Sequence, residues 1–310
     1  MMAVNFYNVS NDWLKYKQST VKHLSYEKYL NIVQKHLSYF KDKNIEDLQE
    51  NEVKDFFYFK EHEEHLSHGT LKIIKQVMKS IFDYCSYEYS IELFDISDIR
   101  FKQNVKSTMV LTNEEKEKIQ MYVNTHTNQL SLAILLSLFA GLRVGEICAL
   151  RKENIDLKNG FISIKESVER IKQKDGNSEL ILLEPRSKAS LRHVPMSSFV
   201  KEFFEKYLTK FSIKDNDYIL SQSEKIYEPR LLQRNLKELG STMNIKTNFS
   251  ILRDTFISNC LHSNMNIKCL CQIIGNVNFA GIYELCPETS DEQKRNEMER
   301  ITIDSIKKAT

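Results

Sequence analysis

Glycine and proline are scarce in this chain, with 8 glycines and 4 prolines among 310 residues. Because these residue types dominate tight turns and interrupt helices, their scarcity predicts a mostly helical protein with few tight turns. No apolar run approaches the ~20 residues that a membrane-spanning helix needs. The first residues also lack the basic and then apolar segments of a signal peptide. We therefore expect a cytoplasmic protein that makes no membrane contact.

Paired cysteines are also missing, because none of the six cysteines forms a CxxC motif. Most of them lie in apolar helical stretches, where we expect reduced, buried thiols rather than disulfides. Cys269 and Cys271 would lie on different faces of a helix, which makes them a poor chelating pair. The sequence predicts no metal site and no bound cofactor.

A large excess of charge is absent as well. The chain has 44 lysines and arginines against 42 aspartates and glutamates, a formal net charge of +2. A polyanion-binding protein needs a basic surface, but balanced totals can conceal one. Several lysines near the N-terminus either face phosphate or form an ordinary solvated helix face. These are Lys15, Lys17, Lys22, Lys72, Lys75 and Lys79.

The chain length favours two domains, since 310 residues exceed one ordinary core. Residues 1–94 carry four apolar stripes with helical spacing, which predict a small four-helix bundle. The expected helices cover about residues 1–20, 25–40, 51–65 and 70–87. We expect Gly69 to mark the stop of the third of them. Residues 95–109 have no clear period and are predicted to be a linker.

A second, larger domain is predicted over residues 110–310. Thr112 and Glu115 have the spacing of a capping box and mark the start of its first helix. Residues 128–140 are almost wholly apolar, so that segment is expected to be a fully buried helix. Further helices are expected at 197–211, 228–243, 250–262 and 267–274, and a charged helix after residue 290.

A change of period after the buried helix predicts a small antiparallel sheet. Apolar residues alternate on both sides of Asn159-Gly160, which is typical of a β-hairpin. Residues 179–184 form a third expected strand. We expect it to pair with residues 193–195 in a second hairpin whose turn lies near 187–190.

Four polar residues stand in surroundings that suggest chemistry. Arg143 follows a helix-breaking glycine, and it either pairs with Glu146 or grips a phosphate with its planar guanidinium. Lys188 lies in a polar hairpin turn, where it is either solvent-exposed or able to give a proton to a leaving oxygen. Arg253 places a cation on a largely apolar helix. Tyr283 is either a core aromatic or a nucleophile.

Five motifs in a fixed order resemble those of the tyrosine recombinase (phage integrase) family. They are AGLRVGE (140–146), SKASLRHVP (187–195), LRDTF (252–256), IIGN (273–276) and IY (282–283). The N-terminal helices look like the family's core-binding (SAM-like) domain, and the residues after the tyrosine look like its C-terminal exchange helix. Integrases of conjugative transposons and of phages of low-GC Gram-positive bacteria are especially similar. The resemblance spans about residues 10–305.

The resemblance implies a mainly α fold, with a four-helix core-binding domain and an α-rich catalytic domain that contains a small antiparallel sheet. It implies an integrase of a mobile element in which Tyr283 attacks a DNA phosphate and forms a 3′-phosphotyrosyl link. Arg143 and Arg253 would stabilise the transition state, Lys188 would be the general acid, and Glu146 would orient Arg143. The implied partners are double-stranded DNA, three further copies in a homotetramer on two DNA sites, and an accessory DNA-bending or directionality factor.

Two positions depart from the family pattern. Ser250 stands where the family usually has histidine, and Asn276 stands where it has histidine or tryptophan; the segment from Gly275 to Tyr283 is also shorter than usual. Both residues still donate hydrogen bonds to a phosphate oxygen, but neither shuttles a proton near neutral pH. A DNA-binding relative with weakened cleavage and an architectural or regulatory role is therefore a second hypothesis. A helical protein unrelated to DNA is a third.

Overall fold

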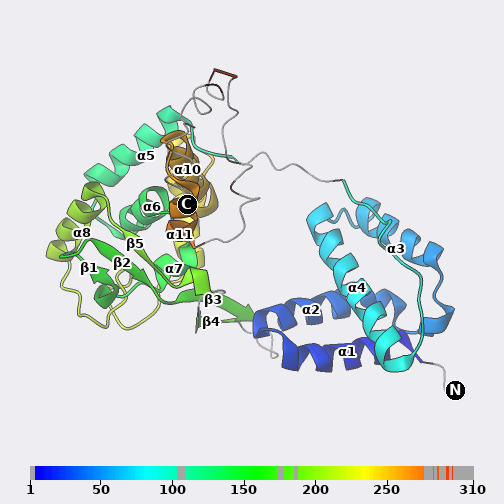
Figure 1. Ribbon diagram of the computed structural model, residues 1–310. Coiled ribbons are helices and arrows are strands. Elements are labelled where there is room, and N and C mark those ends of the chain that lie inside the picture. Colours follow the sequence, from blue (N-terminus) through cyan, green and yellow to red (C-terminus); the bar gives the residue numbers. More distant parts are fainter. Residues whose placement is uncertain are drawn as a thin grey trace, which may run out of the picture. The chain divides into compact units, whose positions relative to one another are not determined.

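The computed structural model describes residues 4–102, 109–172, 178–184 and 188–275, together with residues 282, 285, 291, 292 and 295. Of Lys172 and Lys188 it describes the backbone alone. The chain divides into two compact units, Met1–Lys106 and Ser107–Thr310. Helices dominate both units, and short antiparallel strands lie in the second (Figure 1), so the predicted mainly α fold with a small sheet is confirmed.

The first unit contains the four helices that the apolar stripes predict. They are α1 (Phe6–Thr20), α2 (His23–Lys35), α3 (Glu50–His62) and α4 (His68–Tyr89). Two short 3₁₀ turns, η1 (Leu37–Phe40) and η2 (Ile45–Asp47), connect α2 to α3. The inward faces of the four helices and of these turns form one apolar core around Trp13, Phe40, Phe56 and Met78, which are at most 1% exposed.

The prediction that Gly69 ends a helix is wrong. Ser67 is the N-cap of α4, and its hydroxyl accepts a 3.2 Å hydrogen bond from the backbone N–H of Thr70. Gly69 therefore lies in the first turn of α4. Serine is a preferred N-cap residue, so Ser67-His68-Gly69 begins α4 instead of ending α3.

One of the N-terminal lysines has a structural role. Lys75 on α4 donates hydrogen bonds of 2.8 Å to the carbonyl oxygen of Ser97 and 2.7 Å to that of Ile99. Ile96 is buried in the core of the same unit, and Phe101 packs against it. The segment after α4 thus lies along that helix, and Lys75 fastens it there.

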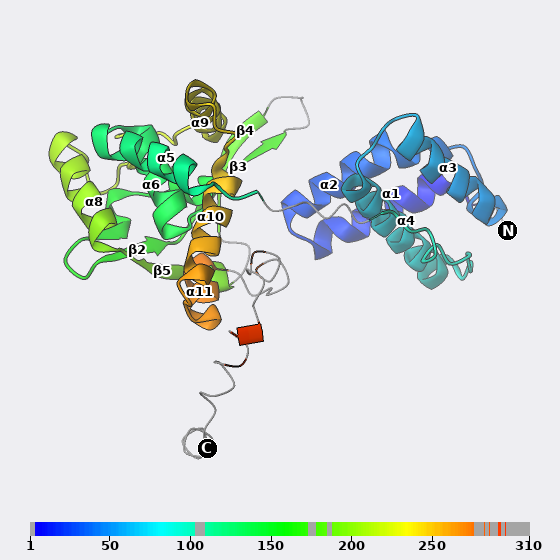
Figure 2. The ribbon, with the colours of Figure 1, turned by 90° about the horizontal axis from the view of Figure 1, so that it is seen from above.

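The second unit is built around one buried helix. Among its described residues the α-helices are α5 (Asn113–Thr125), α6 (Gln129–Ala140), α7 (Val144–Cys148), α8 (Ser198–Lys210), α9 (Pro229–Met243), α10 (Phe249–His262) and α11 (Ile267–Ile274). Helix α6 contacts α5, α7, α8, α9 and α10, and it lies among them in both views (Figures 1 and 2). The predicted burial of this segment and the Thr112–Glu115 capping box before α5 are both confirmed.

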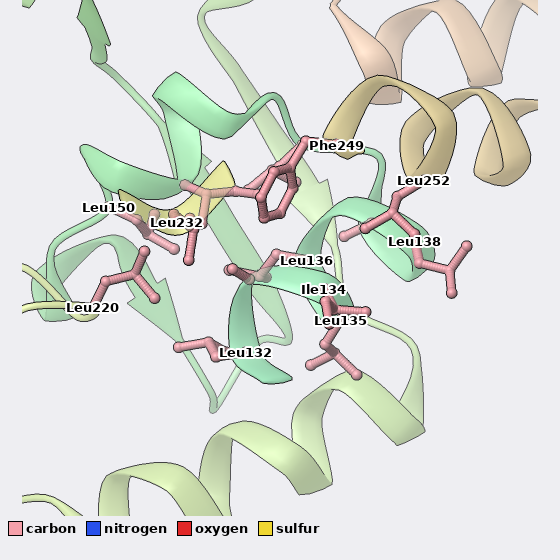
Figure 3. Close-up of a cluster of buried hydrophobic side chains, with 14 of the residues drawn as sticks. Leu132, Ile134, Leu135, Leu136, Leu138, Leu150, Leu220, Leu232, Phe249 and Leu252 are labelled. Atoms are coloured by element: carbon pink, nitrogen blue, oxygen red, sulfur yellow. The ribbon is translucent and has the colours of Figure 1, made fainter. Parts of the chain in front are cut away.

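Packing between α6 and α10 positions the site described below. Leu136 and Leu138 of α6 belong to the same apolar cluster as Phe249 and Leu252 of α10 (Figure 3). The hydroxyl of Ser137 donates a 3.2 Å hydrogen bond to the carbonyl oxygen of Phe249 at the start of α10. Because Leu252 is fully buried against α6, its neighbour Arg253 is held at the surface of that core.

The strands form two separate antiparallel sheets rather than the predicted pair of hairpins. The strands are β1 (Ile155–Asp156), β2 (Phe161–Ile164), β3 (Ser167–Lys172), β4 (Ser178–Leu183) and β5 (Arg192–Pro195). One sheet has the order β1-β2-β5 and the other consists of β3 and β4. The β1–β2 hairpin around Asn159-Gly160 was predicted correctly.

The expected pairing of residues 179–184 with 193–195 is wrong, because β4 pairs with β3 and β5 pairs with β2. Strand β3 was not predicted from the sequence. Its residues SVERIK are mostly polar, and its buried side chains Val168 and Ile171 are three positions apart. Strand β3 therefore lacks the alternation of apolar and polar residues by which a strand is recognised.

The described cysteines are all free, and Cys269 alone among them is exposed. Burial raises the pKa of the Cys148 thiol to about 12. Within the described ranges no cluster of histidine, cysteine, aspartate or glutamate has the arrangement of a metal site. None of the helices there has the length and apolar character needed to cross a membrane.

Candidate functional site

The site begins at the N-terminus of α7, where Arg143 is the N-cap and Glu146 is the third helical residue. Glu146 accepts a 2.9 Å hydrogen bond from the backbone N–H of Arg143 on Oε2 and another of 2.9 Å from Arg143 Nη1 on Oε1. The Glu146 side chain is 4% exposed, whereas that of Arg143 is 43% exposed. The carboxylate is therefore a buried support, and the guanidinium has a face open to a ligand.

Arg253 reaches the same place from α10. Its Nη2 donates a 2.8 Å hydrogen bond to the carbonyl oxygen of Ile274, and its Nη1 donates to the carbonyl oxygen of Gly141. Arg143 Nη1 lies 3.4 Å from the same Ile274 oxygen. Ile274 is the last residue of α11. The unpaired carbonyls at a helix C-terminus carry partial negative charge and favour cations, so this end of α11 brings the two arginines together.

The charges in the site affect one another. Burial and the neighbouring Arg143 lower the pKa of Arg253 to about 9, which leaves its guanidinium charged at neutral pH. Burial acts to raise the pKa of Glu146, but hydrogen bonds and charges from Arg192 and Arg143 outweigh it and hold the pKa below its usual range. Glu146 is thus ionised, and the site contains more positive than negative charge.

Arg192, the first residue of β5, was given no role from the sequence. Its Nη1 and Nη2 donate hydrogen bonds of 2.9 and 2.8 Å to the two oxygens of Glu146, and both side chains are 4% exposed. Its Nε donates a 2.6 Å bond to the carbonyl oxygen of Ile273. Arg192 belongs to the SKASLRHVP motif. In a strand over residues 192–195, the alternation of side chains turns Arg192 to the same face as Val194, toward the protein interior. A charged residue at such a buried strand position is the one feature of the sequence that could have indicated its role.

A cleft of about 1070 Å³ opens beside Arg143 and Arg253. It runs between α9 and the start of α10, and Arg143, Arg253 and Ser250 line one part of it. Its other lining residues are Val144, Gln233, Lys237, Gly240, Ser241, Asn244, Ile245, Lys246, Thr247, Asn248, Phe249 and Asp254.

Ser250 is exposed in this cleft, one helical turn before Asp254 on α10. Burial raises the pKa of Asp254, while the charge of Arg253 and a side-chain hydrogen bond from Ser250 act to lower it. The Ser250 hydroxyl thus has a carboxyl group as a hydrogen-bonding neighbour at the cleft wall. It remains a hydrogen-bonding group at the position where the family pattern has histidine.

Three of the predicted site residues fall partly or wholly outside the described structure. Asn276 and Tyr283 lie outside the described residues, and of Lys188 the backbone alone is placed, in the 3₁₀ turn η4 (Lys188–Ser190). Ile282, which precedes Tyr283, is 2% exposed and belongs to an apolar cluster with residues of α10 and α11. The position next to Tyr283 thus packs on the two helices that carry Arg253 and Ile274.

The arrangement suits an oxyanion with several oxygen atoms. The guanidinium groups of Arg143 and Arg192 both bond to the carboxylate of Glu146, and the charge of that carboxylate also acts on Arg253. Arg143 and Arg253 line an open cleft, in which Lys237 and Lys246 add further positive charge. Guanidinium groups bind phosphate oxygens in pairs and act more strongly where water is excluded. The charge and geometry of the site are therefore chemically suited to an oxyanion such as phosphate.

Comparison with known protein families agrees with this geometry. The family model described as Phage integrase family matches residues 109–283. The tyrosine recombinase XerA of Thermococcus onnurineus is 25% identical over 228 residues, which is 72% of this chain and 72% of that protein.

Solved structures of integrases have a fold similar to that of this chain. The Tn1549 transposon integrase in complex with transposon right end DNA superposes with a TM-score of 0.80 at 19% identity, covering 96% of this chain and 99% of the other. The lambda integrase tetramer bound to a Holliday junction gives a TM-score of 0.68 at 16% identity, covering 94% of this chain and 80% of the other. At such low identity these structures establish the fold that the two proteins share with this chain.

Proposed function

Because this chain belongs to the phage integrase family, we propose that it is a site-specific DNA recombinase that cuts and rejoins DNA through a covalent 3′-phosphotyrosyl intermediate. The observation that carries the proposal is the convergence of Arg143 and Arg253 on the C-terminus of α11, beside an open cleft. The scissile phosphate would lie in that cleft, with its non-bridging oxygens facing the two guanidinium groups.

In the proposed reaction the phenol of Tyr283 releases its proton to solvent, and its oxygen attacks the phosphorus atom. A new phosphorus–oxygen bond forms to the tyrosine as the bond to the 5′-oxygen breaks, and Lys188 gives that oxygen its proton. The DNA strand ends as a 3′-phosphotyrosyl ester and a free 5′-hydroxyl. Since the ester keeps the energy of the broken bond, attack by another 5′-hydroxyl rejoins DNA and releases the tyrosine without ATP.

Each of the supporting residues has a distinct part in this mechanism. Arg143 and Arg253 stabilise the negative charge that develops around the five-coordinate phosphorus, and stabilisation of this kind supplies much of the rate enhancement in many enzymes. Glu146 holds Arg143 through the two hydrogen bonds described above. Asn276 would donate a hydrogen bond to a phosphate oxygen, and the Ser250 hydroxyl would do so by rotating its single O–H from Asp254 to the phosphate.

The proposal also assigns the two parts of the chain and their partners. Residues 1–94 would be the core-binding domain, 95–109 the linker, whose first residues pack on the core-binding domain, and 110–310 the catalytic domain with its exchange helix. Double-stranded DNA would be clamped largely through its phosphates. Four copies would act on two DNA sites, an assembly supported by the lambda integrase tetramer on a Holliday junction, and an accessory DNA-bending or directionality factor is part of the same proposal.

A second candidate function rests on Ser250. Its hydroxyl cannot transfer protons near neutral pH as histidine does, and its carboxyl neighbour Asp254 accepts its hydrogen bond. Losing acid–base help costs ~10² to 10⁴ in rate. On this alternative the chain binds the same DNA with little strand cleavage and serves an architectural or regulatory role.

A nicked suicide substrate separates the two functions. Cleavage near the nick releases a short fragment, so the covalent protein–DNA complex cannot reverse and accumulates. The recombinase predicts an adduct from the wild-type protein and none from Tyr283→Phe. Binding of the cognate duplex without any adduct would instead support the architectural function, and absence of salt-sensitive DNA binding would contradict both.

A further inference from the structure

Arg192 does not line the cleft, yet it is among the most enclosed charged side chains of the second unit. Its side chain is 4% exposed, and the cleft residues do not include it. Burying a guanidinium is costly unless its hydrogen bonds are satisfied in good geometry. The contacts that compensate this cost therefore show what Arg192 holds in place.

The first of these contacts fills every acceptor position of Glu146. Oε1 accepts 2.9 Å hydrogen bonds from Arg143 Nη1 and Arg192 Nη1, and Oε2 accepts bonds of 2.9 and 2.8 Å from Arg143 N and Arg192 Nη2. A carboxylate offers about four acceptor positions. Each oxygen of Glu146 thus has one donor from Arg143 and one from Arg192, so the second arginine fixes the orientation in which the carboxylate supports the first.

The remaining donors of Arg192 connect two further segments. Nε donates 2.6 Å to the carbonyl oxygen of Ile273, the residue before the Ile274 carbonyl that Arg143 and Arg253 share. Nη1 also donates 3.1 Å to the carbonyl oxygen of Ser190, the last residue of η4. One guanidinium therefore ties together the start of α7, the end of α11 and the 3₁₀ turn η4, which begins at Lys188.

We infer that Arg192 is a positioning residue for the strand-cleavage reaction, which holds Glu146 and the C-terminus of α11 so that Arg143 and Arg253 meet the phosphate together. The inference rests on the proposed function, because its effect is exerted on DNA cleavage. Arg192 acts through other residues and makes no contact with the phosphate itself. A simple fold-stabilising ion pair is the alternative, and the experiment must separate the two.

The experiment compares Arg192→Met and Arg192→Lys with Arg170→Met in the full-length chain. Arg170 is a matched control, because it pairs with Glu228 in the same unit and its side chain is 24% exposed. Each variant is measured for thermal unfolding, for affinity to cognate duplex DNA by gel shift, and for single-turnover cleavage of the nicked substrate at saturating protein between pH 5.5 and pH 9.

Arg192→Met is expected to cleave bound DNA about 10²-fold more slowly, the loss that a misplacement of ~1 Å produces. Its DNA affinity is expected to change by less than about threefold, since Arg143 and Arg253 remain. Without Arg192, the pKa of Glu146 rises, so cleavage by this variant falls as the pH decreases through a range where the wild type is constant. Arg192→Lys keeps the charge but not the two-pronged geometry, and it is expected to be intermediate.

Arg170→Met is expected to lose stability while keeping the wild-type cleavage rate and pH profile. If folded Arg192→Met does the same, Arg192 is a structural ion pair and the inference is overturned. Should Arg192→Met fail to fold, Arg192→Lys decides alone, and a wild-type rate and pH profile for that variant overturns the inference. If the wild-type protein forms no adduct, the proposed function has failed instead, so the two failures are distinguishable.

Discussion

Arg253 and Ile274 lie on different helices, and Arg253 Nη2 donates a 2.8 Å hydrogen bond to the carbonyl oxygen of Ile274. Through this bond the guanidinium of α10 is fixed at the C-terminus of α11, eight residues before the chain reaches Ile282. The same carbonyl lies 3.4 Å from Arg143 Nη1. A single backbone carbonyl thus fixes the positions of both guanidinium groups.

The first prediction concerns Arg253 itself. Arg253→Lys keeps a positive charge but loses the planar fork that reaches two carbonyl oxygens and a phosphate together. We expect DNA cleavage to fall by about 10² to 10³-fold, as for removal of one preorganised donor, while affinity for duplex DNA falls far less. Single-turnover cleavage and gel-shift titration test this. Equal losses of affinity and of cleavage rate would contradict a role confined to the transition state.

The second prediction uses a pair of glycines with left-handed backbone. Gly275 has φ +63°, and a Cβ there would lie 3.0 Å from both the Ala189 carbonyl oxygen and Arg192 Nη1. Gly160 has φ +72° and no atom within 4 Å of such a Cβ. Both alanine variants should lose about 1–2 kcal/mol of unfolding free energy from backbone strain.

Gly275→Ala should lose more than Gly160→Ala, because its methyl group also displaces the end of α11 from the arginines. Urea denaturation measures the two unfolding free energies, and cleavage of a nicked substrate measures activity. Cleavage should fall in Gly275→Ala and remain unchanged in Gly160→Ala. Equal stability and equal activity for both variants would show that the end of α11 tolerates displacement.

The third prediction is a pH dependence of stability. The folded pKa of Glu146 lies below its unfolded value of about 4.3. Its ion pairs therefore stabilise the fold fully above about pH 4.3, and this stability is lost as the pH falls through the lower, folded pKa. Glu146→Gln should be less stable than wild type by about 3–5 kcal/mol at pH 7, as for a broken buried ion pair.

The difference in unfolding free energy between wild type and Glu146→Gln should therefore narrow as the pH is lowered below about 4.3. Urea denaturation of both proteins from pH 7 to pH 3 measures it. A difference that stays constant over the whole range would mean that the Glu146 carboxylate contributes nothing through its charge.

Some of the contacts behind these predictions could be expected from the sequence, and others could not. The helices follow from apolar spacing, and α11 was predicted at its observed limits because a polar Asn266 and a glycine flank one apolar run. Arg143 and Arg253 stood out because each is a cation beside buried residues. Glu146 was expected to support Arg143, which the hydrogen bonds between them match.

The role of Arg192 was not visible in the sequence. Its partners Glu146 and Ile273 lie 46 and 81 residues away, and no local period reports such contacts. Strand pairing failed for the same reason, because the true partner of β5 is β2 rather than the nearer β4. Local propensity and spacing determine elements, whereas long-range pairing depends on packing that only the folded chain displays.

The fourth prediction separates an active recombinase from a weakened relative. Ser250→His restores at the cleft wall a side chain that transfers protons near neutral pH. If Ser250 limits the reaction, cleavage should rise by about 10-fold or more, within the range of acid–base help. The double variant Ser250→His with Asn276→His tests both departures together.

Matched Ser250→Ala serves as the control for this prediction, since it removes the hydroxyl without adding a base. If Ser250→His cleaves DNA at the wild-type rate and Ser250→Ala cleaves it more slowly, the serine hydroxyl is sufficient for the cleavage reaction. That outcome would contradict the hypothesis that this chain is a DNA-binding relative with weakened cleavage. A large gain in the double variant would support it.

The central claim is that Tyr283 forms a 3′-phosphotyrosyl bond in a site assembled by Arg143 and Arg253. The most direct measurement traps the adduct on a nicked cognate duplex, digests it, and identifies the DNA-linked peptide by mass spectrometry. The account predicts a nucleotide attached to Tyr283 through its 3′-phosphate, and a released strand with a free 5′-hydroxyl that polynucleotide kinase can label. An adduct on any other residue, an adduct that persists in Tyr283→Phe, or a released 5′-phosphate would contradict it.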